Sequence, residues 1–301
     1  MKRFFLSSLL VCVVVSFVQA QSFYAVRRER SLILVVGTGS ASYFGELKDN
    51  NKIDQKLNFT AGLQVYVTSR ISARAEATWF QLSGSDATTK DGSLRKRNLN
   101  FTSSNVELSV TGAVNFLPNG NRFYRRPGFN VYGFGGVGAL YFNPKTVYNG
   151  QKIALQPLHT EGVNYSRFAI VIPFGIGARL KLGPNMNLAI EGGYRKTFTD
   201  YLDDVSTTYP DPAKLTSPEA IALSNRAVDN FGNPNPAYGA PGRQRGNPAN
   251  KDSYFLLNAK LEYYLPGNFS LFGGGGGRKL GGFNRKRNSS FYRYNRNGRL
   301  K

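Results

Sequence analysis

Three acidic residues, Asp200, Asp203 and Asp204, lie close together in the sequence and carry the carboxylates that Ca²⁺ prefers as ligands. Calcium takes about six to eight oxygen ligands, and only these three carboxylates are present in the segment. We therefore interpret the segment as a solvated acidic strand end, with a Ca²⁺ site as the alternative.

The single histidine, His159, offers a second kind of chemistry, since Thr160 and Glu161 follow it. A hydrolytic site needs a nucleophile oriented by a base, as a Ser and a His on one strand face would provide. No such pair accompanies His159, and we expect no catalytic residues. One His and one Cys also exclude a zinc site built from these residue types and a disulfide framework. Because no convincing Gly-rich phosphate-binding motif is present, no cofactor is expected.

The elements that would position such side chains are strands, because apolar and polar residues alternate along several segments. In residues 59–67, Phe59, Leu63 and Val65 share one face while Thr60 and Gln64 lie on the other. The same period of two recurs in 71–79, 105–116, 168–176, 187–195 and 255–265, and the Gly-rich segments 32–47 and 129–143 have strand-like composition. The sequence therefore predicts eight strands.

The apolar faces of these strands are long and nearly uninterrupted, while charged residues lie on the opposite face. After the N-terminal region, no segment offers the ~18 consecutive apolar residues of a membrane-spanning helix. A closed barrel crosses a bilayer with apolar residues toward lipid and polar residues toward the lumen. The predicted fold is therefore all-β, an eight-stranded up-and-down transmembrane β-barrel. A water-soluble barrel or sandwich in the periplasm is the alternative.

The connections between strands alternate in length, as in outer-membrane barrels, which have short periplasmic turns and longer outside loops. Long loops are expected at 48–57, 84–98, 144–166 and 206–252, short turns at 68–71 and 183–186, and an intermediate connection at 118–128. An even number of strands places both chain ends on the periplasmic side. Within the longest loop, Ser217-Pro218-Glu219 predicts the start of a short helix.

Eight charged residues, four acidic and four basic, fall on lumen-facing positions of the expected strands. They are Arg74, Glu76, Glu107, Arg179, Glu191, Arg195, Lys260 and Glu262. The interior of an eight-stranded barrel is just wide enough to be filled by side chains. Because buried charges need partners, we predict a paired network that plugs the barrel, with a transport or proton pathway as the less favoured alternative.

The N-terminus has the features of a secretory signal peptide, predicted at residues 1–20. Lys2 and Arg3 precede an apolar run over residues 4–18, and a small-residue cleavage pattern ends at Ala20. This run is too short for a permanent anchor helix, which needs ~20 residues. Although the formal net charge is +21, export argues against nucleic acid as the partner.

A Gly/Arg-rich tail, residues 267–301, follows the barrel predicted at 21–266. It has no acidic residue after the five consecutive glycines that begin at Gly273. We expect a disordered periplasmic segment that binds an acidic protein or anionic headgroups, or that has no specific partner. The expected periplasmic contacts are Arg122, Arg125 and Arg126 of the 118–128 connection and Arg278, Lys279, Arg285, Lys286 and Arg287 of the tail.

Several strings resemble the PorG-type outer-membrane barrel family of the type IX secretion system of Bacteroidota. They are Y-F-G-E-L at 43–47, Y-F-N-P at 141–144, T-D-Y-L-D-D-V-S-T-T-Y at 199–209 and D-S-Y-F at 252–255. The similarity spans residues 31–266. Its most specific string is D-Y-L-D-D-V-S, which contains Asp200, Tyr201, Asp203 and Asp204.

This resemblance implies a non-enzymatic component of a machine that exports adhesins, proteases and gliding-motility proteins. It implies that periplasmic ring proteins are the partners, a lipoprotein among them, and that the barrel ties this ring to the outer membrane. Outer-membrane lipid surrounds such a barrel, and no small-molecule substrate is expected. The alternative is a stand-alone surface barrel whose long loops bind an external ligand or protein.

Overall fold

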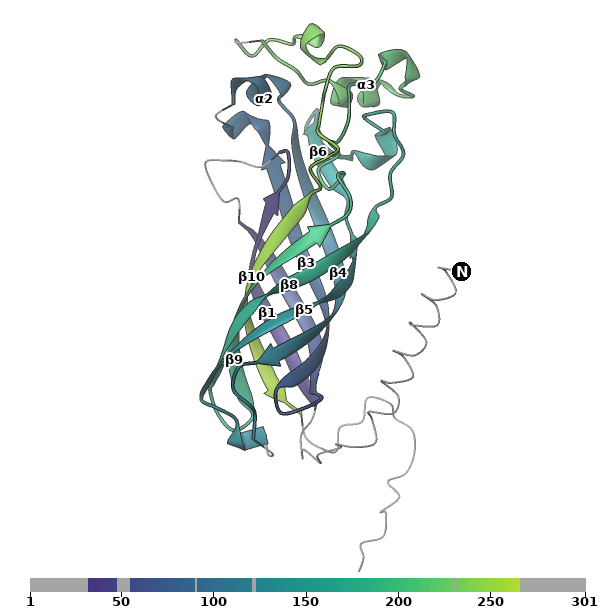
Figure 1. The fold of residues 1–301 in the computed structure, drawn as a ribbon. Helices are drawn as coiled ribbons and strands as arrows, with labels where there is room; N and C mark the ends of the chain where they lie inside the picture. The colour runs from purple at the N-terminus through teal and green to yellow at the C-terminus, as the bar shows by residue number, and fades with distance from the viewer. Residues whose placement is uncertain (1–31, 48–54, 90, 121–122, 230, 266–301) are drawn as a thin grey trace, which may run out of the picture. The chain divides into compact units, whose positions relative to one another are not determined.

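Eight antiparallel strands form the wall of the molecule (Figure 1). The computed structural model describes residues 32–47, 55–89, 91–120, 123–229 and 231–265. The wall strands are β1 (Leu32–Phe44), β2 (Lys56–Tyr66), β3 (Ile71–Ser85), β4 (Asn100–Asn115), β5 (Phe129–Tyr141), β8 (Phe168–Lys181), β9 (Met186–Thr197) and β10 (Ser253–Tyr264). Each segment predicted from the alternation overlaps one of these strands.

The wall closes into a barrel. Neighbouring strands pair in the order β3-β2-β1-β10-β9-β8-β5-β4, and β3 pairs with β4 to complete the circle. The first strand therefore meets the last, with Ile33 opposite Tyr264 and Phe44 opposite Ser253. The predicted eight-stranded up-and-down barrel is confirmed.

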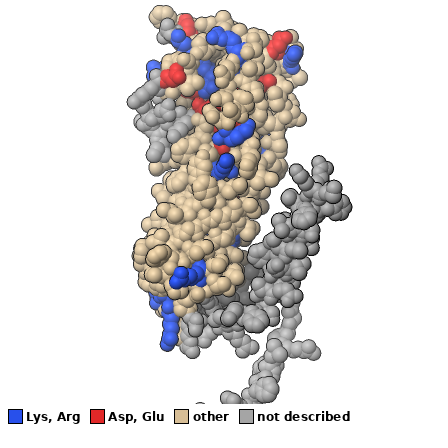
Figure 2. Space-filling view, viewed as in Figure 1, with Lys and Arg blue, Asp and Glu red and all other residues tan. Residues whose placement is uncertain are grey.

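The outer face of the wall is apolar because the side chains alternate between the two faces. On β4 and β8, Leu108 is 60 % exposed and Ile170 is 65 % exposed, whereas the adjacent Glu107 and Val171 are fully buried. In Figure 2 the charged side chains gather toward the ends of the molecule and leave an uncharged band between them. Such a band matches the hydrocarbon layer of a bilayer.

Along β3 the polarity of the two faces is exchanged, although side chains continue to point alternately inward and outward. Up to Trp79 the outward residues are apolar and the inward ones are polar or charged. Beyond Trp79, Phe80 and Leu82 are buried inside, while Gln81 and Ser83 lie on the outer face. The strand therefore continues past the apolar band and exchanges its lipid-facing pattern for the pattern of a water-soluble protein.

The two ends of the barrel differ in their connections. Among the described residues, the short-turn end consists of 67–70, 182–185, 116–120 and 123–128, the last with the 3₁₀ turn η3 (Phe123–Arg125). Among the described residues, the long-loop end consists of 45–47, 55, 86–89, 91–99, 142–167, 198–229 and 231–252. It carries the helices α2 (Gly92–Arg97) and α3 (Pro218–Ser224) and the 3₁₀ turns η2 (Asp86–Thr88), η4 (Gln156–Leu158), η5 (Pro212–Lys214) and η6 (Pro236–Gly239).

Two local expectations for the long-loop end have different outcomes. The helix predicted at Ser217 is confirmed, because the Ser217 hydroxyl caps α3 by accepting a hydrogen bond from the Ala220 N–H. The segment 144–166, expected to be a plain loop, contains the hairpin β6 (Pro144–Tyr148) and β7 (Gln151–Ala154). The start of β6 pairs with β4, which extends the sheet beyond the wall.

No helix in the described part of the chain is both long and apolar enough to span a membrane. The predicted signal peptide, residues 1–20, and the predicted tail, residues 267–301, lie outside the described residues.

Candidate functional site

Four charged side chains meet inside the barrel, where alternation along β3, β9 and β10 brings them to one level. Arg74 forms a two-bond ion pair with Glu191, and its Nε lies 3.0 Å from Glu76 Oε2. Lys260 Nζ lies 2.6 Å from an oxygen of Glu76 and 2.6 Å from one of Glu191. All four side chains are at most 5 % exposed. Their mutual pairing compensates the cost of removing each charge from water.

Two further ion pairs flank this cluster along the barrel. Toward the short turns, Arg179 donates to both oxygens of Glu262 at 2.7 and 2.8 Å. Toward the long loops, Arg195 Nε lies 3.6 Å from Glu107, which also accepts a 2.7 Å hydrogen bond from the Tyr254 hydroxyl. The structure thus brings together all eight charged residues that the sequence placed in the lumen, and we call this region the ionic half.

Above the ionic half, the interior is filled by apolar side chains that the sequence analysis did not anticipate. From the wall come the buried residues Ala41, Tyr43, Phe80, Leu82, Phe101, Leu140, Val171, Tyr254 and Leu256, and from the loops come Leu47, Leu99, Phe142, Leu155, Leu202, Val205 and Leu223. We call this region the apolar half. Along β10, Tyr254 and Leu256 precede Lys260 and Glu262, so the two halves are stacked along the barrel axis.

A set of buried ion pairs joins the long loops to one another above the apolar half. Arg97 donates to both oxygens of Asp86, at 2.8 Å each, and also to the Arg245 carbonyl. Arg245 donates to Glu161 at 2.9 Å and to the Asp204 carbonyl. Glu161 also accepts hydrogen bonds from the backbone N–H groups of residues 206 and 207. These contacts tie the loops at 86–99, 142–167 and 198–252 into one unit, which we call the loop cap.

The acidic strand end is not solvated as the sequence suggested. Asp200, Asp203 and Asp204 are each at most 2 % exposed, because the loop cap folds over them. The neighbouring Tyr201 is half-buried and stacks on Tyr165 with 4.5 Å between ring centroids. Within the described ranges, no three His, Cys, Asp or Glu side chains are arranged to hold a metal ion.

Burial raises the pKa values of aspartates beneath the loop cap. It raises the pKa of Asp200 and of Asp204 to about 6, and it raises the pKa of Asp252 to about 8. Asp252 accepts a 2.5 Å hydrogen bond from the Tyr43 hydroxyl and another from the Leu202 N–H. Buried carboxyl groups with raised pKa values thus form the base of the loop cap, and Asp252 among them is hydrogen-bonded to Tyr43 and Leu202.

The residues expected to contact periplasmic partners differ in their exposure in the structure. The expectation that Arg126 contacts a periplasmic partner is wrong, because its side chain is buried. Its guanidinium donates hydrogen bonds to Asn187 and to the carbonyls of Gly183, Pro184 and Met186. It therefore links two turns from inside the molecule. Arg125 is exposed. Arg122, Arg278, Lys279, Arg285, Lys286 and Arg287 lie outside the described residues.

Comparison with solved structures finds eight-stranded outer-membrane barrels. Neisserial surface protein A is 8 % identical over 78 % of this chain and 97 % of its own, with a TM-score of 0.39. A major outer membrane protein from Thermus thermophilus is 12 % identical over 77 % of this chain and 98 % of its own, also with a TM-score of 0.39. Ail of Yersinia pestis is 12 % identical over 78 % of this chain and 99 % of its own, with a TM-score of 0.35.

Comparison with curated protein sequences found no match. The family model described as "Outer membrane protein beta-barrel domain" matches residues 8–210. The matched range includes every wall strand except β10. Since it covers more than half of the 301 residues, this chain belongs to the outer membrane protein beta-barrel domain family.

Proposed function

We propose that this outer-membrane barrel is a non-enzymatic anchor subunit of a protein secretion machine of the type IX kind. The observation that supports it is the filled interior, in which the ionic half and the apolar half occupy successive levels of the barrel. A barrel filled in this way works through its two ends rather than through a channel. The assignment to a type IX secretion system rests on the resemblance of the sequence at 199–209 to PorG-type barrels.

In this proposal the long-loop end faces outward and the short-turn end faces the periplasm, following the usual arrangement of loop lengths. The family-like acidic residues are buried in the base of the loop cap, so they stabilise the fold rather than touch a partner. The contact with periplasmic ring proteins then falls to exposed residues such as Arg125 and to the cations of the tail.

A non-enzymatic role is consistent with the surroundings of the single histidine. His159 ends the turn η4 with a left-handed backbone conformation. The nearby Glu161 carboxylate is occupied by Arg245 and by backbone N–H groups, and Thr160 donates to Asp204. These acceptors and donors contribute to the loop cap instead of activating a nucleophile.

The test is deletion of the chain in its native cell, followed by measurement of protein secretion and a crosslinked pull-down from outer membranes. We expect a secretion defect that the full chain restores, with periplasmic ring proteins captured by the full chain. A version that ends at Pro266 shows whether the tail makes the contact. Normal secretion after deletion would overturn the proposal.

A second candidate function, a stand-alone surface barrel that binds an external ligand or protein, is favoured by the loop cap. Buried pairs such as Arg97–Asp86 and Arg245–Glu161 hold three long loops in one conformation, which pre-organises a surface for binding. This candidate predicts normal secretion after deletion and loss of an external binding activity.

A further inference from the structure

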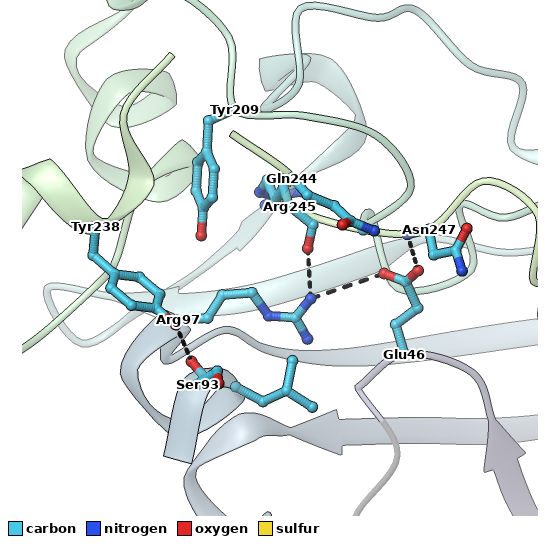
Figure 3. Close-up of a pocket in the computed structure, with 10 residues that line it drawn as sticks. Glu46, Ser93, Arg97, Tyr209, Tyr238, Gln244, Arg245 and Asn247 are labelled. Atoms are coloured by element: carbon cyan, nitrogen blue, oxygen red, sulfur yellow. Dashed lines mark hydrogen bonds and ion pairs between the residues drawn. The ribbon is translucent and has the colours of Figure 1, made fainter. Parts of the chain in front are cut away.

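A pocket of about 370 Å³ opens in the loop cap, between α2, the residues after β1 and the 206–252 loop (Figure 3). Its volume lies near the lower end of the ~300–1,000 Å³ range of small-molecule sites. The residues that matter for its chemistry are Glu46, Leu94, Arg97, Tyr209, Tyr238 and Arg245. They come from three parts of the sequence that only the folded loop cap brings together.

Two buried polar atoms in this pocket have no hydrogen-bond partner. Tyr209 is 3 % exposed, and its hydroxyl points into the space bordered by Tyr238 and Arg97 (Figure 3). The Glu46 side chain is 10 % exposed; its Oε1 accepts from the Asn247 N–H, but its Oε2 accepts no hydrogen bond and lies 3.8 Å from Arg97 Nη1. Because an unsatisfied buried polar group is costly, such a pair points to groups that a ligand supplies.

The charges around the pocket limit the kind of ligand. Arg97 is paired with Asp86 and Arg245 with Glu161, so neither guanidinium is left for a strongly anionic group. A cationic ligand would meet the guanidinium groups of Arg97 and Arg245, which both line the pocket. A neutral ligand with several hydroxyl groups avoids both penalties, since hydroxyls donate and accept hydrogen bonds.

The rest of the lining suits the apolar faces of such a ligand. Tyr209 and Tyr238 bring aromatic rings, and Leu94 adds an aliphatic side chain. The Tyr238 hydroxyl donates to the Ser93 carbonyl at 2.9 Å, which fixes its ring against α2. A flat C–H surface next to hydroxyl groups, as in a pyranose ring, matches aromatic faces beside a carboxylate oxygen and a phenol.

We propose that this pocket binds a neutral sugar, with ligand hydroxyls paired to Glu46 Oε2 and to the Tyr209 hydroxyl and the sugar ring packed against the tyrosine rings. This goes beyond the proposed anchor function and does not depend on it. It also revises the expectation from the sequence that no small molecule binds.

The test uses the full chain in dimethylamine-oxide micelles, because common glycoside detergents would compete for the pocket. Methyl α-D-mannopyranoside, methyl β-D-glucopyranoside and N-acetyl-D-glucosamine are titrated separately to about 20 mM, where a millimolar Kd is measurable. Calorimetry gives the affinity, and saturation-transfer NMR shows which sugar protons face the protein. We expect saturable binding of at least one of the three sugars.

Two conservative variants locate the binding. Tyr209→Phe removes only an unpartnered hydroxyl, so it should preserve the fold and weaken binding about fivefold. Glu46→Gln should weaken it about tenfold, as expected when an amide replaces one oxygen of the carboxyl group that pairs with the ligand hydroxyl. Tyr124→Phe, a tyrosine change at the short-turn end, should leave the affinity unchanged, and thermal melting verifies that each variant is folded.

Three results would overturn the proposal. They are the absence of saturable binding by all three sugars, equal affinity of folded Tyr209→Phe and Glu46→Gln with the parent chain, and preferential binding of choline or sulfate, which would assign the pocket to charged ligands.

Discussion

The two halves of the barrel interior follow opposite rules. Along β3, inward residues of the ionic half are polar or charged and outward ones apolar up to Trp79, whereas in the apolar half Phe80 and Leu82 lie inside and the polar Gln81 and Ser83 lie outside. The change occurs along single strands, so strand geometry does not cause it. On β3, therefore, the inward side chains complement the surroundings of the outer face, which are lipid up to Trp79 and water beyond it.

The two halves are therefore stabilised by different forces. The ionic half depends on complete pairing, because removing one partner leaves another charge buried. The apolar half depends on close packing and on apolar area removed from water. Substitutions that separate these two forces are the means of testing the comparison.

The largest effect is expected from Glu191→Gln in the ionic half. Arg74 and Lys260 would then share Glu76 alone, and the free energy of unfolding should fall by about 3–5 kcal/mol. Urea unfolding in liposomes measures the change, with Glu219→Gln on the exposed face of α3 as the matched control. A loss below about 1 kcal/mol would mean that lumen water, not pairing, compensates these charges.

A somewhat smaller and more local effect is expected from Leu202→Ala in the apolar half. Leu202 is 1 % exposed, and truncating it should cost about 3 kcal/mol by leaving a cavity under the loop cap. Hydrogen exchange of residues 199–252 should speed up while exchange in the wall strands is unchanged. Leu257→Ala, on the outer face of β10, is the matched control and should leave the loop-cap exchange as it was. Equal acceleration in the wall would contradict the separation of the two halves.

A change of pH should loosen the loop cap without affecting the ionic half. The folded pKa of Asp252, about 8, and that of Glu46, about 7, both lie above the usual ~4 of an unfolded carboxyl, because both groups are buried. The folded state therefore holds more protons, and stability is greatest below pH ~4 and falls progressively up to pH ~8.

Between pH 6 and 8 the loss should be on the order of 2 kcal/mol, visible as faster loop-cap exchange after correction for the intrinsic rate. Asp252→Asn should flatten this dependence. A loop cap that tightened as the pH rose would show that these carboxyl groups are ionised in the folded state.

The smallest expected effect is on conductance in planar bilayers. Neither the parent chain nor Glu191→Gln should give a stable ohmic step, because the apolar half remains packed when the ionic half is perturbed. A reproducible step from the parent chain would show that the two filled levels do not seal the barrel.

The wall of the barrel was predictable because lipid enforces a strict pattern on the sequence. Along residues 59–67 and 71–79 every second residue is apolar, and the outward faces of β2 and β3 are those same positions. The strand prediction fails beyond the part of the wall that faces lipid. Beyond Trp79 the pattern of apolar and polar residues is inverted, so the predicted segment ends at Trp79 and the expected loop begins at Gly84, within β3. The β6–β7 hairpin is likewise not predicted.

The candidate site was predictable only where alternation decides burial. The eight lumen charges were identified because each lies one position away from an apolar outward residue. Asp204 and Arg126 were misjudged because their partners are distant in sequence. Asp204 is buried through Arg245, 41 residues away, and Arg126 through Asn187, 61 residues away. Nothing in the local composition indicates those contacts.

The seam between β1 and β10 determines when the barrel can be completed. These strands are among the first and last parts of the wall to be synthesised, and they join along their whole length from Ile33–Tyr264 to Phe44–Ser253. Until β10 arrives, β1 has an open edge that can pair with the wrong strand or the wrong molecule. Contacts this distant in sequence also form slowly. Assembly in the membrane therefore requires that the edge of β1 be protected until β10 pairs with it, and a chain cut within β10 would leave the wall open however well the rest had folded.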